Sequence, residues 1–150
     1  MQPLNQNDLQ TKIDGRFRSI STIWFGLFLS VGLYYVLTLY TGNPHEDVRP
    51  NRRLFLALAA AGALLVIISV LIKQKFLKQS VDEQRVELVQ TGYTVAWAIS
   101  EVAALLGLLD FFLTGNRHYY LLFIIAACGH LLNFPRRQHL LDASFKSSTF

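Results

Sequence analysis

The sequence predicts an all-α integral membrane protein built as a bundle of four transmembrane helices. Of its 150 residues, 52% are hydrophobic and only 16% are charged, whereas about 25% are charged in a typical soluble domain. The apolar residues gather in four blocks, at 20–40, 54–72, 92–113 and 119–134. A helix needs about 20 apolar residues to cross the hydrocarbon of a bilayer; three blocks reach that length and the fourth nearly does. We therefore expect a single membrane domain over residues 1–150 and exclude a soluble globular enzyme.

The first block, 20–40, is too long to be the apolar part of a cleaved signal peptide, which spans about 7–15 residues. No small-residue cleavage pattern follows it. We therefore expect this block to remain in the chain as a transmembrane helix.

The second and third blocks, 54–72 and 92–113, are expected to form the most closely packed pair of helices. Transmembrane helices associate where small residues let their backbones approach. The second block is rich in alanine and contains Gly62 and Ala63. The third block carries small residues at spacings of three or four positions: Ala96, Ser100, Ala103 and Gly107.

The fourth block, 119–134, follows a turn of only a few residues, so it is predicted to lie antiparallel to the third. The segment 73–91 is predicted to be a charged cytoplasmic loop whose apolar stripe extends the two flanking helices. The segments 1–19 and 135–150 are predicted to be polar tails.

The distribution of basic residues predicts the orientation of the bundle. Ten of the 14 Lys and Arg residues lie in segments 1–19, 73–91 and 135–150, which share one side if the chain crosses four times. Basic residues are enriched on the cytoplasmic side of membrane proteins. We therefore expect both termini in the cytoplasm (N-in/C-in) and an inner or cytoplasmic membrane location. This topology accounts for the net charge of +4, so we expect no nucleic-acid partner.

Glu101 is the residue that helix packing does not explain. It lies near the middle of the third block, and no Lys or Arg lies inside any of the four blocks. A charge at that depth costs at least ~2.5–3.5 kcal/mol, so we expect the carboxyl to be mostly protonated or hydrogen-bonded. One interpretation is a reversible proton-binding site. The other is a neutral carboxyl that bonds across helices to Ser30, Tyr34 or a backbone carbonyl.

Four residues are expected to support the Glu101 carboxyl by packing. Depth matching places Gly62 and Ala63 of the second block at its level, where the partner backbone can approach closely. Trp97 lies one turn before Glu101 on the same helix face, and Ser100 directly precedes it. The second helix offers few oxygen ligands at this level, so a proton is a better candidate than Na⁺.

Asp110 is the second acidic residue within the apolar blocks. It lies nine residues after Glu101, on the opposite helix face and near the outer end of the third block. We expect it to pair with Arg117 or Arg52.

The segment around Glu101 resembles a known family. Residues 90–109, with Ala98-Ile99-Ser100-Glu101 followed by an aliphatic run and Gly107-Leu108, resemble the carboxylate-bearing helix of subunit c of F-type ATP synthases. The segment 78–80 faintly resembles the polar loop of that family, and the resemblance covers residues 54–113 as a helical hairpin. It implies that Glu101 takes up and releases a proton as it passes the half-channel of a partner subunit.

His130 is a candidate of a different kind. The spacing of Ala126 and His130 resembles the chlorophyll-ligating motif of antenna polypeptides, in which the small residue leaves room for a flat ring. The resemblance implies a chlorophyll-type pigment on His130. The alternative is an interfacial histidine that is hydrogen-bonded to a lipid headgroup or a carbonyl.

The remaining chemistry-bearing residues predict no enzyme and no metal site. Cys128 is the only cysteine, and the adjacent residues His45, Glu46 and Asp47 cannot readily converge on one ion. We expect a small non-enzymatic membrane subunit with a protonatable carboxyl, in or beside a bioenergetic complex, with the bilayer and other subunits or further copies as partners. The alternatives are a structural accessory subunit, in contact with pigment or lipid, and a small proton-coupled transporter.

Overall fold

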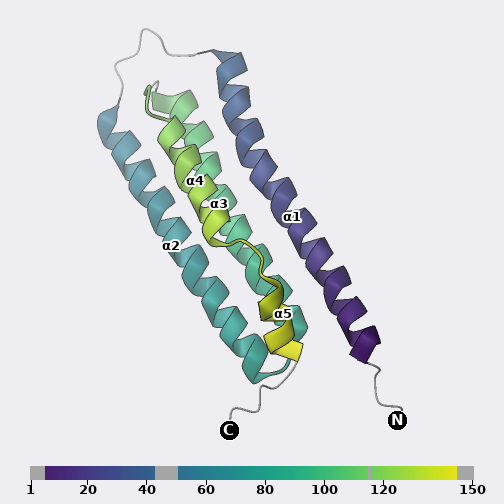
Figure 1. Ribbon diagram of the computed structural model, residues 1–150. Helices are drawn as coiled ribbons and strands as arrows, with labels where there is room; N and C mark the ends of the chain where they lie inside the picture. Colours follow the sequence, from purple (N-terminus) through teal and green to yellow (C-terminus); the bar gives the residue numbers. More distant parts are fainter. Residues whose placement is uncertain (1–5, 43–50, 115, 145–150) are drawn as a thin grey trace.

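The computed structural model describes residues 6–42, 51–114 and 116–144, with side chains from Gln10 onward, and all of its secondary structure in these ranges is helical. The five helices are α1 (Gln6–Thr41), α2 (Arg52–Asp82), α3 (Val86–Thr114), α4 (Tyr120–Leu132) and α5 (Arg137–Ser144). They lie roughly parallel in one elongated bundle (Figure 1). One end of the bundle holds α5, the start of α1 and the α2–α3 turn. We call it the α5 end, and we call the opposite end the far end.

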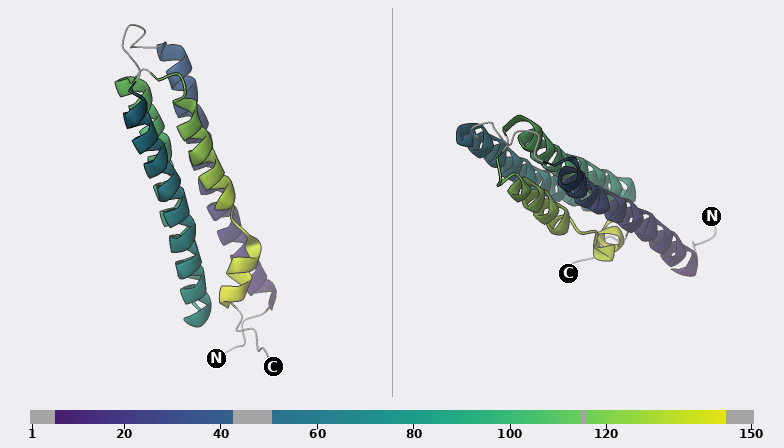
Figure 2. Two further views of the ribbon diagram at one scale, coloured as in Figure 1. Left: turned by 90° about the vertical axis from the view of Figure 1, so that its left-hand side faces the viewer. Right: turned by 90° about the horizontal axis from the view of Figure 1, so that it is seen from above.

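Three helices, α1, α2 and α3, are long and apolar enough to cross a membrane, which confirms a helical membrane protein. The fourth block behaves differently from expectation. Helix α4 has 13 residues, or about 20 Å at 1.5 Å per residue, too short to cross about 30 Å of hydrocarbon. The expected set of four full-length transmembrane helices is therefore not supported. Instead, α4, the connection 133–136 and α5 together run along the bundle back to the α5 end (Figures 1 and 2).

Helix α4 ends early because of the residues that follow it. Pro135 lacks a backbone N–H and disfavours helical backbone at the residue before it, Phe134. Asn133 already has non-helical backbone angles, with φ −99° and ψ 24°. The chain then turns into α5 within the predicted polar tail.

The helices also continue past the apolar blocks into the polar segments. Helices α2 and α3 occupy most of the predicted loop 73–91, as the apolar stripe in that loop indicated, and α1 begins at Gln6. Lys, Arg, Gln and Glu, which are frequent there, are good helix formers. Outside the hydrocarbon their side chains are solvated, so the helices do not have to end at the edge of the bilayer.

Close packing of α2 on α3, the expected tightest pair, is confirmed, since this pair shares the most extensive interface in the bundle. Two glycines make it possible. A Cβ built on Gly92 would lie 2.7 Å from the Phe76 Cβ, and one on Gly62 would lie 3.8 Å from the Ala103 Cβ and 3.2 Å from Leu122 of α4. Helix α1 packs on α3, α4 and α5, and in the described part of the chain it does not contact α2.

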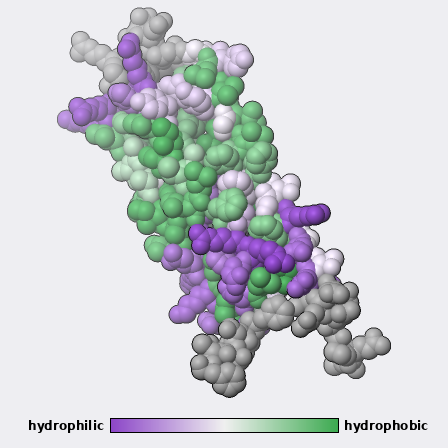
Figure 3. Space-filling model, viewed as in Figure 1, coloured by the Kyte–Doolittle hydropathy of each residue, from purple (hydrophilic) through white to green (hydrophobic). Residues whose placement is uncertain are grey.

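The surface matches a bilayer environment. Large apolar side chains are exposed along the middle of α1 and α2, among them Phe25, Leu33, Leu64, Ile67 and Leu71. In Figure 3 hydrophobic residues cover the central part of the molecule, and hydrophilic residues gather toward its ends.

Candidate functional site

The carboxyl of Glu101 lies where α1, α3 and α4 meet. The Ser30 Oγ of α1 lies 2.5 Å from Glu101 Oε1 and 2.6 Å from the Leu27 carbonyl oxygen, and its one hydrogen can be donated to either acceptor. The His130 Nε2 of α4 lies 3.5 Å from Glu101 Oε2. The imidazole is fully buried, and 14% of the Glu101 side chain is exposed. The Tyr34 side chain also interacts with the carboxyl. Hydrogen bonding across helices to Ser30, one of the two interpretations of Glu101, is thus present.

The backbone of α4 determines which nitrogen of His130 carries a hydrogen. Nδ1 lies 3.1 Å from the carbonyl oxygen of Ala126. A carbonyl can only accept a hydrogen bond, so Nδ1 must be the donor. The second nitrogen, Nε2, is thereby the one that faces Glu101 Oε2.

Within the described part of the chain, the Glu101 carboxyl and the His130 imidazole face each other with one unpartnered atom each. Neither Glu101 Oε2 nor His130 Nε2 has another hydrogen-bond partner among the described residues. If the carboxyl were ionised and Nε2 bare, two lone pairs would face each other at 3.5 Å inside the protein. One proton on either atom converts this repulsion into an attraction and leaves the pair with no net charge. We call Ser30, Glu101 and His130 the carboxyl–imidazole site.

The rotation of α3 explains why Glu101 faces α1 and α4. Its neighbour Ser100 points to α2, where its hydroxyl lies 3.3 Å from the Ser69 Oγ. Consecutive residues of a helix are rotated by about 100°, so Glu101 points away from the α2–α3 interface.

The four residues expected to pack against the Glu101 carboxyl therefore lie at different places in the bundle. Gly62 is buried between α3 and α4, against Ala103 and Leu122, whereas Ala63 is exposed on the outer face of α2 and lends no packing support. Trp97 and Ser100 are fully buried, but their polar groups bond to other partners.

The Ser100 hydroxyl contacts the Ala96 carbonyl and Ser69, whereas the partner of Trp97 belongs to the end of α4. The Trp97 Nε1–H donates to the Asn133 carbonyl at 2.9 Å, the Trp24 Nε1–H to the His130 carbonyl at 3.0 Å, and the Lys73 Nζ to the Leu132 carbonyl at 2.9 Å. The last carbonyls of a helix have no partner within it, and the bilayer core holds no water to replace one. Three long helices thus each supply one donor that satisfies the end of α4.

This cap also holds His130 at the depth of Glu101. Lys73 places a positive charge at the negative end of the α4 dipole, and its ammonium lies 5.7 Å from the centre of the Tyr93 ring. The side-chain amide of Asn133 donates to the Ser69 Oγ at 2.9 Å, which ties the same point to α2. With the end of α4 held by all three neighbours, the imidazole cannot shift along α3.

Asp110 does not make the expected ion pair. It is fully buried, and its Oδ1 accepts a hydrogen bond from the Thr114 hydroxyl at 2.8 Å. Arg52 and Arg117 are both exposed, and neither forms a salt bridge with Asp110 within the described ranges.

His130 does not fit the pigment ligand that its sequence context implied. The side chain has no exposed area, and its two ring nitrogens face the Ala126 carbonyl and Glu101. A pigment bound at Nε2 would have to displace Glu101. The group His45–Glu46–Asp47 lies outside the described residues, and no cluster of metal-binding side chains occurs within them.

The sequence does not reveal that His130 faces Glu101 or that three helices cap the end of α4. Its pattern predicts a loop at Lys73 and offers no partner for His130. Pro135 was the available signal, because it ends the helix soon after His130 and so places the imidazole deep in the bundle.

The fold and the carboxyl–imidazole site define a helical membrane protein with a polar pair inside its apolar region. Comparison with protein-family models, with curated proteins and with solved structures finds no match to the chain.

Proposed function

We propose that this chain is a small non-enzymatic membrane subunit in which the carboxyl–imidazole site binds and releases a proton. The observation that carries the proposal is the 3.5 Å separation of Glu101 Oε2 and His130 Nε2, with Nδ1 already committed to the Ala126 carbonyl. Loss of the shared proton leaves one negative charge in the bundle, and gain of a second leaves one positive charge. Ser30 can stabilise the ionised carboxyl by donating to its other oxygen.

The proposal includes a topology of four crossings with both termini in the cytoplasm. Helices α1, α2 and α3 supply three crossings, and α4 with the connection 133–136 supplies a shorter fourth, which ends where α5 begins. The proposal is supported by the shared end of the bundle at which α1 begins and α5 ends (Figure 1). The ten basic residues in segments 1–19, 73–91 and 135–150 favour the cytoplasmic side for that end.

The resemblance of residues 54–113 to subunit c implies that Glu101 exchanges its proton with a partner subunit. This exchange would take place within or beside a bioenergetic complex of an inner or cytoplasmic membrane. The close packing of α2 on α3 is compatible with a c-like hairpin. The carboxyl faces α1 and α4 rather than α2, so the exchange would take place on the α1–α4 side. Other membrane subunits or further copies of this chain are the expected partners.

Labelling with a hydrophobic carbodiimide tests the proposal, because this reagent modifies protonated carboxyl groups in the bilayer. We expect modification of Glu101, located by mass spectrometry, that declines as the pH rises. Asp110→Asn should leave this labelling unchanged, and Glu101→Gln should abolish it. His130→Gln removes the base that shares the proton and should change the pH dependence of labelling. Absence of modification at every pH in folded protein contradicts a proton-binding role.

A structural role is the second candidate, and a specific observation favours it: the site connects three helices through Ser30, Glu101 and His130. Glu101→Gln separates the two candidates, because the amide retains the shape and an acceptor for Ser30 but cannot release a proton. If proton flux in reconstituted vesicles and association with co-purifying subunits are both unchanged, the structural role is correct. A small proton-coupled transporter would instead show flux without partner subunits.

A further inference from the structure

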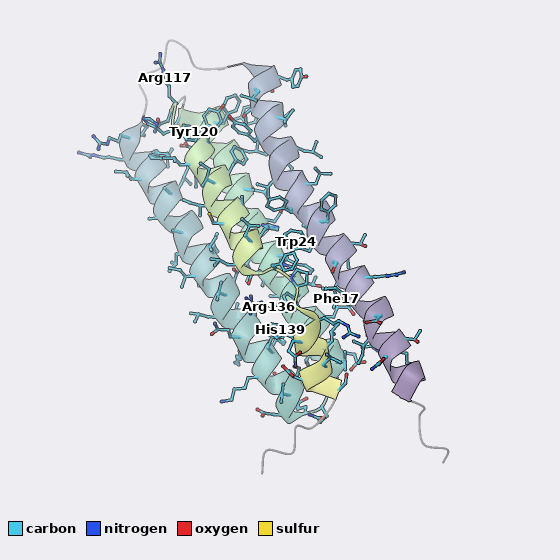
Figure 4. All side chains as sticks on the ribbon, viewed as in Figure 1. Phe17, Trp24, Arg117, Tyr120, Arg136 and His139 are labelled. Atoms are coloured by element: carbon cyan, nitrogen blue, oxygen red, sulfur yellow. The ribbon has the colours of Figure 1, made fainter. Side chains whose placement is uncertain are left out.

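A cluster of three basic side chains lies at the junction of α4 and α5. Lys73 comes from α2, Arg136 from the connection, and His139 from α5. The three residues gather around Tyr93: the Lys73 Nζ lies 5.7 Å from the centre of the Tyr93 ring, and the Tyr93 hydroxyl contacts His139 Nδ1 and the Arg136 backbone N–H. Figure 4 shows Arg136 and His139 at this junction. We call the three residues the junction cluster.

The backbone of the junction cluster is held in place by Tyr93. The Arg136 backbone N–H donates to the Tyr93 hydroxyl at 3.1 Å, and the same hydroxyl lies 2.6 Å from His139 Nδ1. These contacts fix the Arg136 backbone and the His139 ring, and the Arg136 side chain is exposed on the surface.

Arg136 differs from the other arginines near it in having no acidic partner. Arg137 pairs with Asp14 at 2.8 Å, and Arg16 pairs with Glu87 at 3.0 Å. Arg136 is exposed, and it forms no ion pair within residues 6–42, 51–114 and 116–144. Its nearest charged neighbours include the ammonium of Lys73, so an excess of positive charge is left at this point of the surface.

Apolar side chains that face outward precede this charge directly in the chain. Leu131, Leu132 and Phe134 are exposed by 56%, 62% and 49%, at the end of α4 and in the connection. The surface at the junction therefore passes from hydrocarbon-facing groups to an unpaired cation within a few residues. A phospholipid with an anionic headgroup is complementary to this surface, because its acyl chains match the apolar side chains and its phosphate matches the cation.

We propose that the junction cluster binds an anionic phospholipid. The Arg136 guanidinium holds the phosphate, with the bidentate geometry that arginine offers to phosphate oxygens. Lys73 adds positive potential behind it, and the acyl chains lie on Leu132 and Phe134. The headgroup supplies the negative charge that this junction lacks, and so fixes the depth of the α4–α5 connection in the membrane. This inference does not rest on the proton-binding role of Glu101.

Native mass spectrometry of the full chain in a mild detergent tests the inference. We expect phosphatidylglycerol to bind more tightly than phosphatidylcholine, and Arg136→Gln to weaken phosphatidylglycerol binding about fivefold, the effect of one basic residue near a lipid surface. Arg52→Gln is the matched control, since it removes the same charge from an exposed position at the far end of the bundle. It should leave the affinity unchanged. Arg136→Lys, which keeps the charge but not the planar fork, should be intermediate.

Three outcomes would overturn the inference. Equal affinity for the two lipids excludes an anionic site, and equal weakening by Arg136→Gln and Arg52→Gln indicates attraction to net charge alone. Competition by millimolar inorganic phosphate would show a site for free phosphate rather than for a lipid. Because Arg136 is exposed, its variants should fold, and an unchanged unfolding midpoint verifies this.

Discussion

At the scale of single residues, the chemistry of Glu101 is decided by its neighbours on other helices. A carboxyl in the middle of an apolar helix can be recognised as costly from the sequence, and hydrogen bonding was the expected remedy. In the structure, the Ser30 hydroxyl contacts one oxygen of the carboxyl, and the His130 imidazole faces the other. The imidazole is oriented by its own backbone bond to Ala126, so its second nitrogen faces the carboxyl.

A single glycine sets how closely α4 approaches the two helices that flank this site. A Cβ on Gly129 would lie 2.8 Å from the Val66 Cγ2 and 3.0 Å from the Ser100 Oγ. Gly129→Ala should therefore push α4 outward and lower the free energy of unfolding by about 1–3 kcal/mol, the usual effect of overpacking. Equilibrium unfolding in detergent micelles measures this.

Gly26→Ala is the matched control for that substitution. It adds the same methyl group to a helix where nothing lies within 4 Å, and should be neutral or slightly stabilising because alanine favours helix. Equal destabilisation by both variants would contradict the close contact of α4.

At the scale of helices, the short α4 and its separation from α5 distinguish this bundle from one of four simple spans. Helix α4 stops inside the bundle, and donors from α1, α2 and α3 satisfy its last carbonyls. Helix α5 then continues to the α5 end, where Leu140 and Ala143 pack with Ile13, Ile20 and Trp97 in a hydrophobic cluster. The position of α5 thus depends on this cluster and on the hydrogen bonds of Tyr93.

The docking of α5 should depend on pH through His139. Burial lowers the pKa of His139 below its ordinary value of 6.5; the positive charges of Lys73 and Arg136 act in the same direction, and Asp142 opposes them. A histidine with a lowered pKa favours the neutral form in the folded state. Its contribution to stability is therefore present above about pH 6.5 and is lost as the pH falls from there toward the folded-state pKa.

Thermal unfolding of the wild type and of His139→Gln measures this effect. When the pH falls from about 7.5 to about 5, the unfolding midpoint temperature should decrease more in the wild type than in the variant, because glutamine does not titrate. Identical losses in both proteins would show that His139 does not link α5 to pH.

At the scale of the whole molecule, the chain forms a bundle whose two ends differ in composition. The α5 end holds α5, the start of α1, the α2–α3 turn and the ion pairs of Arg16 and Arg137. An apolar surface separates this end from the far end (Figure 3). If the membrane lies around the apolar surface, the α5 end is in one aqueous compartment.

The proposed orientation can be tested with single cysteines in a Cys128→Ser background. Lys12→Cys and Gln138→Cys lie at exposed positions near the α5 end, and Asn51→Cys lies at an exposed position at the far end. In intact cells, a maleimide that cannot cross the membrane should label only Asn51→Cys. After permeabilisation it should label all three.

Labelling of Lys12→Cys but not Gln138→Cys in intact cells would contradict the proposed fourth crossing. Labelling of both would reverse the orientation inferred from the basic residues.

The sequence by itself determined the membrane character of the protein, the location of its three long helices and the importance of Glu101. These properties follow from local composition, because about 20 successive apolar residues can be counted along the chain and a lone acid among them is conspicuous. The extension of α2 and α3 through the charged segment 73–91 was also indicated by its apolar stripe.

Only the tertiary structure decided which groups meet Glu101. Ser30 and His130 lie 71 and 29 positions away from Glu101 in the chain, and their meeting depends on the rotation of α3 and on the depth at which α4 stops. That depth is set by Trp24, Lys73 and Trp97, which come from three different helices. Contacts between distant segments depend on helix rotation and register, and hydropathy along a single chain carries little information about either.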